Sequence, residues 1–178
     1  MMDLKSYLLA RLESEAALTR KAVARVPEGR NDFKPHEKSM ALGYLAALVA
    51  GMPGWITLMI ERDELNLDDP ASNGFRPQVA ATSAHLMEGF DAAVASARRS
   101  LQATTNEHLL TPWAFKMGGH AVSQEPRHIM IANAVFSHLA HHRGQLTVYL
   151  RLNEAKVPAI YGMSADENPF EAAAAAKG

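Results

Sequence analysis

Apolar residues recur every three or four positions through most of this chain, the spacing that places side chains on one face of an α-helix. In the first stretch, Leu8, Leu12 and Val23 fall on one side, and Arg11 and Lys21 fall on the other. The same pattern predicts four long amphipathic helices, over residues 4–26, 39–63, 79–103 and 126–153. With no internal repeat and almost no strand signal, we predict an all-α fold, a single four-helix bundle.

Turn-forming residues separate these helices. Pro53 should kink the second helix or divide it in two. Residues 66–77 (NLDDPASNGFRP) are typical of a long surface crossover, so the second and third helices need not be antiparallel. Residues 113–122 alternate around Gly118 and Gly119, which predicts either a small β-hairpin or an open loop before the last helix.

Length and composition are those of one globular domain. The chain has 178 residues, of which 48% are apolar and 21% are charged, enough to build a sizeable core. We expect residues 1–170 to form this domain. Residues 171–178 (EAAAAAKG) have helix propensity but little to pack against, and we expect them to fray.

Charge and cysteine content exclude several kinds of chemistry. With 18 Lys and Arg against 19 Asp and Glu, the net charge of -1 creates no field for nucleic acid, so we expect no nucleic-acid partner. The chain contains no cysteine, which excludes a disulfide framework, a thiolate metal ligand and a cysteine nucleophile. Any metal site must therefore use His, Asp, Glu and water.

The compartment can be predicted from two segments. The N-terminal residues carry charges every few positions and resemble no secretory signal, so we expect a cytoplasmic protein. Residues 40–60 carry no formal charge and are long enough to cross a bilayer. Glycines and Pro53 dilute this segment, and a membrane span would leave the other helices without partners, so we interpret it as a buried helix and expect no membrane partner.

Two histidines stand one helical turn apart in the last predicted helix. His138 and His142 share a sector of about 60° with Gln145, beside the apolar stripe, and Tyr149 lies two turns on. Neutral imidazoles at positions i and i+4 can bind one metal ion. The alternative is a buried pair that is hydrogen-bonded to Gln145, Tyr161 or water and is kept neutral by burial.

Several longer motifs occur in order between Lys38 and Glu167: KSMALGYLA, MPGW, WAFKMGGHAV, HLAHHRGQLTVYLRL and VPAIYGMSADE. Together they resemble the DinB-like family, a damage-inducible superfamily that also includes bacillithiol- and mycothiol-dependent transferases. The resemblance implies a four-helix bundle with up-down-down-up connectivity, homodimers, and a divalent metal such as Zn or Ni. It also implies three histidine ligands for that metal, two of them at the positions of His138 and His142.

The third family histidine belongs to the second helix, just before MPGW, where this chain has Leu48 in the sequence LAAL. An alkyl side chain cannot bind a metal, and no histidine occurs between residues 37 and 84. A metal site here would be degenerate, because a catalytic zinc site usually has three protein ligands and water. The candidates for a substitute donor are Glu61, His85, His120 and Asp166.

Two functions follow from these observations. The first is a divalent-metal-dependent transferase or hydrolase acting on a small molecule, in which a thiol cosubstrate supplies the nucleophile that a cysteine-free chain lacks. The second is a stress-associated dimeric bundle without catalysis or metal, which binds a small ligand or nothing. For this second function we expect a pocket lined by Leu48, Val135, His138, His142 and Tyr161, with Gln145 and Tyr149 as further candidates.

Overall fold

The structure is a computed structural model that describes residues 3–70, 72 and 76–168 of the chain. It is mostly helical, with one small sheet. The helices are α1 (Leu4–Val23), α2 (Leu42–Gly51), η1 (Met52–Gly54), α3 (Trp55–Glu61), α4 (Ser83–Ala103), α5 (Asn106–Leu110), α6 (Arg127–Met130), η3 (Ile131–Ser137) and α7 (His138–Leu152). The predicted tail at residues 171–178 lies outside the described residues.

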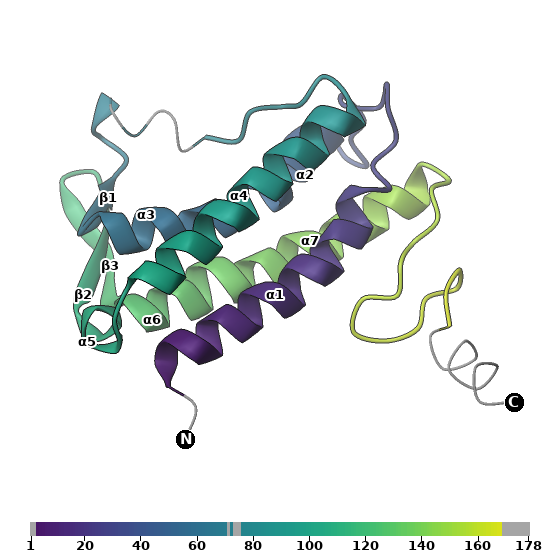
Figure 1. Cartoon of the computed structure of the whole chain (residues 1–178). Helices are drawn as coiled ribbons and strands as arrows, with labels where there is room; N and C mark the ends of the chain where they lie inside the picture. The colour runs from purple at the N-terminus through teal and green to yellow at the C-terminus, as the bar shows by residue number, and fades with distance from the viewer. Residues whose placement is uncertain (1–2, 71, 73–75, 169–178) are drawn as a thin grey trace, which may run out of the picture.

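The long helices pack side by side. Helix α4 contacts α1, α2 and α3, and α7 contacts α1 and α2. Figure 1 shows α1 and α7 running in one direction, and α2, α3 and α4 running in the other. Helices α3 and α4, on either side of the crossover, run in the same direction, in agreement with the expectation that the second and third helices need not be antiparallel (Figure 1).

Local signals fix several helix ends. The Asp3 carboxylate accepts a hydrogen bond from the Ser6 backbone N–H at 2.7 Å and so caps α1. Thr82 and Thr105 cap α4 and α5 in the same way. The predicted start of the second helix at residue 39 is wrong: α2 begins at Leu42, after Ala41, whose side chain makes no cap. Helix α2 starts there because the Leu42 N–H donates to the Phe33 carbonyl in the preceding loop.

Proline acts on the second predicted helix as expected. Pro53 lies in η1, a short 3₁₀ turn that divides the helix into α2 and α3. In the last helix the structure adds a feature that the sequence pattern did not predict. Residues Ile131–Ser137 form a π-helical turn, η3, directly before the histidine pair.

The hairpin alternative for residues 113–122 is confirmed. Strands β2 (Pro112–Met117) and β3 (His120–Pro126) pair antiparallel, and both turn glycines have positive φ. The Asp68 carboxylate accepts hydrogen bonds from the N–H groups of Gly118 and Gly119 at 3.1 and 2.9 Å, which fixes the turn. The all-α prediction missed β1 (Glu64–Asn66), which pairs parallel with β2 and completes a three-stranded sheet.

The apolar segment in the second predicted helix is part of the core. Within the described residues, Leu42–Glu61 is the one helical stretch with the length and composition of a membrane span, and 61% of its most apolar window is buried. It packs against α4 on one side and α7 on another. We therefore identify it as a core helix.

Candidate functional site

The two histidines lie at the start of α7. His142 is buried and His138 is half-buried. Their ring centroids are 4.5 Å apart, and the Trp55 ring at the start of α3 lies 5.7 Å from that of His138. The pair therefore faces the α2–α3 side of the molecule, as the helical spacing predicts.

A chain of hydrogen bonds joins the two rings to Gln145. The Nε2 atoms of His138 and His142 are 2.8 Å apart, and His142 Nδ1 lies 2.8 Å from Gln145 Oε1. An amide oxygen can only accept, so His142 donates through Nδ1 and, as a neutral ring, accepts at Nε2. The bond between the two Nε2 atoms then requires His138 to donate through its Nε2. The Gln145 amide nitrogen lies 3.1 Å from Nε2 of the exposed His141, which ends the chain at the surface.

This environment favours the neutral form of His138. Burial lowers the pKa of His138 below its usual value of 6.5, and the neighbouring His142 lowers this pKa further. A hydrogen bond with the Ala134 backbone acts in the opposite direction but is a smaller effect. These effects favour a neutral His138, which has a single N–H to donate either to His142 Nε2 or to the Ala134 carbonyl.

The donor set around this pair does not match a three-histidine metal site. Leu48, where the resemblance implies a third histidine, is buried and carries no donor atom. Across the described residues, no group of three His, Asp or Glu side chains could hold one metal ion. A cation between the two rings would require both Nε2 atoms to be free of protons, because a metal binds through their lone pairs.

The four substitute donors have other surroundings. His85 is exposed on α4 and His120 is exposed where β3 begins. The Glu61 carboxylate accepts a hydrogen bond from Ser100 Oγ at 3.1 Å. Asp166 forms an ion pair with Arg151 and accepts a hydrogen bond from the Val157 N–H at 2.7 Å. None of them joins His138 and His142 in a metal-binding group.

The two tyrosines predicted to line the pocket lie elsewhere. The Tyr149 hydroxyl donates to the Met40 carbonyl at 3.0 Å, and its ring packs edge-on against Phe33 in the core. Tyr161 extends from the C-terminal segment to Arg143 and Glu15. The structure thus brings Gln145 to the histidine pair, but Tyr149 and Tyr161 bind other partners.

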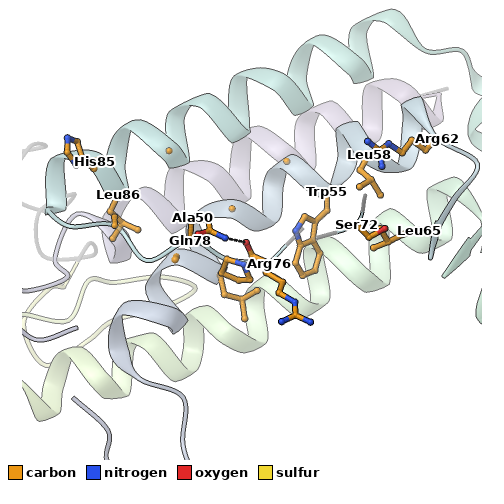
Figure 2. A pocket seen from close by; sticks show the side chains of 17 residues that line it. Ala50, Trp55, Leu58, Arg62, Leu65, Ser72, Arg76, Gln78, His85 and Leu86 are labelled. Carbon is orange, nitrogen blue, oxygen red and sulfur yellow. Dashed lines mark hydrogen bonds between the residues drawn. The ribbon is translucent and has the colours of Figure 1, made fainter. Parts of the chain in front are cut away.

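A pocket of about 500 Å³ lies beside this pair, between α2, α3, α4 and the crossover segment (Figure 2). Leu48 and Trp55 line it, together with Arg62 and Arg76. Trp55 also touches His138, so one indole ring borders both the pocket and the histidine pair. The sequence pattern could not reveal the two arginines, because the tertiary path of the crossover brings Arg76 back over α2 and α3.

Comparisons with known proteins agree on one family. The family model described as DinB family matches residues 1–171. Solved DinB-like structures from Bacillus cereus and Bacillus subtilis share 19% and 18% identity with the chain. They have TM-scores of 0.64 and 0.63, and cover 86% and 85% of this chain and 95% of each of their own.

A putative DinB family member from Exiguobacterium sibiricum has 19% identity and a TM-score of 0.61, covering 86% of this chain and 94% of its own. None of the curated proteins compared by sequence gave a match. At these identities the solved structures show a shared fold.

Proposed function

The chain belongs to the DinB family, and on that premise we propose that it is a cytoplasmic small-molecule-binding protein with an up-down-down-up four-helix bundle and a degenerate metal site. One observation carries this proposal. The His138 and His142 rings satisfy each other and Gln145 through hydrogen bonds, while Leu48 stands where a third ligand is needed. In this proposal the two histidines are hydrogen-bonded to each other and no longer bind a metal, and the ligand binds in the adjoining pocket.

A second candidate is a divalent-metal-dependent transferase or hydrolase with a thiol cosubstrate. The convergence of two Nε2 atoms supports it, as does the bond from His142 Nδ1 to Gln145, because metal-binding histidines usually donate their other N–H to a fixed partner. A Zn or Ni ion held there would supply Lewis acidity. With only two protein donors, we expect weak retention of such an ion.

Metal content distinguishes the two candidates. The wild-type protein, Leu48→His and His142→Ala are purified without a histidine tag, and bound Zn, Ni, Mn and Fe are measured by elemental analysis. We expect the wild type to contain less than one metal ion per ten chains and Leu48→His to contain close to one per chain. Leu48→Ala is the control, because it shortens the same side chain without adding a donor.

Stoichiometric metal in the wild type that His142→Ala abolishes would overturn the degenerate site and establish the metal-dependent candidate. We also propose a homodimer, as the family resemblance implies. Sedimentation equilibrium measures its mass, and a monomer at micromolar concentration would contradict it.

A further inference from the structure

The pocket beside Trp55 combines an apolar floor with a basic rim. Its apolar lining includes Leu48, Trp55, Leu58 and Leu86, contributed by α2, α3 and α4. Its volume of about 500 Å³ falls in the range of pockets that enclose small organic molecules. This floor favours a ligand with an apolar body.

The rim carries positive charge that nothing in the described structure neutralises. Arg62 and Arg76 both line the pocket, and no Asp or Glu is among its described lining residues. Neither arginine forms an ion pair within the described part of the chain, although eight ion pairs occur elsewhere in it. In Figure 2 the two arginines lie apart, with Trp55 and Leu58 labelled between them.

The backbones of both arginines are held in place. The Arg76 carbonyl accepts from the Gln78 side chain at 3.3 Å, and the Arg62 carbonyl accepts from the buried Arg127 at 3.2 Å. Among the described residues, neither guanidinium group has a hydrogen-bond partner. Guanidinium binds carboxylate through two parallel hydrogen bonds, which makes a carboxylate the matching head group.

We propose that this pocket binds a small amphipathic carboxylate, with its apolar body against Leu48, Trp55 and Leu86 and its carboxylate at Arg76. This assignment deepens the proposed small-molecule function, on which it rests, by naming the class of ligand. Because Trp55 also contacts His138, an occupant of the pocket would adjoin the histidine pair through that ring.

Isothermal titration calorimetry of the full-length protein with three probes tests separately whether binding needs an apolar body and whether it needs a carboxylate. Octanoate supplies an apolar body and a carboxylate, 1-octanol supplies only the body, and acetate supplies only the charge. We expect octanoate to bind at least tenfold more tightly than 1-octanol, and acetate not to bind at millimolar concentration. Octanoate affinity no greater than that of 1-octanol would overturn the proposal, and so would the absence of octanoate binding.

Arginine variants test the head group. We expect Arg76→Gln to weaken octanoate binding about tenfold and Arg62→Gln to weaken it less, and we expect both variants to leave 1-octanol binding unchanged. The control is Arg99→Gln, because Arg99 is an exposed arginine of α4 that does not line the pocket. Unchanged octanoate affinity in Arg76→Gln would exclude Arg76 as the carboxylate site.

A filled pocket tests the location. Gly89 lines the pocket from α4, and a Cβ atom added there meets no atom within 4 Å, so the first atom of a new side chain fits without a clash. The variant Gly89→Leu fills the pocket from this position. We expect it to abolish binding of both octanoate and 1-octanol. Gly144→Leu is the matched control, because Gly144 is an exposed helical glycine with equally open surroundings outside the pocket.

Octanoate binding that persists in Gly89→Leu would place the ligand elsewhere and contradict the pocket assignment. The metal content of Leu48→His is measured at the histidine pair and does not depend on the two arginines. A failed titration with the expected metal result would therefore remove the carboxylate assignment alone.

Discussion

Two adjacent residues of α7, His142 and Arg143, are both buried but belong to opposite kinds of environment. The hydrogen bonds of His142 stay within α7, with His138 and Gln145. Arg143 instead reaches across the molecule to Glu15 on α1 at 2.8 Å and to Tyr161 in the C-terminal segment. On one side of the helix, the histidine hydrogen bonds stay within α7. On the other side, a charged side chain connects α7 to α1 and to the C-terminal segment.

The charged side is fully compensated. The Arg143 guanidinium also donates to Thr19 Oγ1 at 2.8 Å and to the Glu15 carbonyl at 3.2 Å. The Glu15 carboxylate accepts from the Tyr161 hydroxyl at 2.8 Å and pairs with Arg11 at 3.1 Å. Because both charges of the central pair are 1% exposed, every lost partner leaves a buried charge that water cannot reach. This difference predicts that the Arg143 side determines stability, whereas the His142 side can change without unfolding the protein.

Replacing Glu15 should have the largest effect. Glu15→Gln removes the charge that compensates the buried Arg143, so we expect a loss of about 3 kcal/mol in the free energy of unfolding, measured by urea denaturation. Glu13→Gln is the matched control, because Glu13 pairs with Arg98 at the surface, where 51% of its side chain is exposed. We expect that variant to lose less than about 1 kcal/mol. Equal losses in the two variants would contradict the distinction between the buried pair and surface pairs.

Tyr161 tests the outer partner of the same cluster. Tyr161→Phe removes a hydroxyl that bonds both Arg143 and Glu15 but leaves the ion pair itself, so we expect a loss of about 1 kcal/mol. Tyr7→Phe is the control, because Tyr7 is exposed on α1 and its hydroxyl has no hydrogen bond in the described structure. If both variants unfold at the same urea concentration, the C-terminal segment is not held by this hydroxyl.

The sequence predicted the histidine side better than the arginine side, for a physical reason. His138, His142 and Gln145 lie on one helix, so a spacing of 100° per residue is enough to bring them together. The partners of Arg143 come from residues 15, 19 and 161, and only the tertiary fold brings them within reach. The same limit applies to Tyr161, which was assigned to the pocket although its hydroxyl binds Arg143 and Glu15.

The predictions of the fold differ in the same way: features that depend on a residue's own backbone were predicted, and features that depend on distant partners were missed. Proline and glycine positions predicted the break at Pro53 and the turn at Gly118 and Gly119, because each acts through its own backbone. Strand β1 was missed because three residues carry too short a pattern, and its partner strand lies about fifty positions away. The π-helical turn before His138 was missed because apolar spacing does not distinguish it from α-helix over so few residues.

The pH dependence of the free energy of unfolding should give the smallest of these effects. It tests the side of α7 that carries His138 and His142. The pKa of His138 is lowered in the folded state by burial and by His142, so the unfolded chain binds this proton first as the pH falls through 6.5. The stability that uncharged His138 contributes to the folded state is thus fully present above about pH 6.5 and is lost below it. We therefore expect the wild type to be less stable at pH 5.5 than at pH 7.5. The effect is small because His138 is half-buried, so that water screens its charge.

His138→Gln should flatten this pH dependence in urea denaturation at the two pH values, and Glu15→Gln should leave it intact, because Glu15 pairs on the opposite side of α7. His120→Gln is the control for loss of an imidazole, since His120 lies in the exposed hairpin. A cation between the two rings would make the loss at acid pH steeper, because two imidazoles would take up protons as the ion leaves. EDTA would then lower the stability at pH 7.5, whereas a neutral hydrogen-bonded pair is insensitive to it.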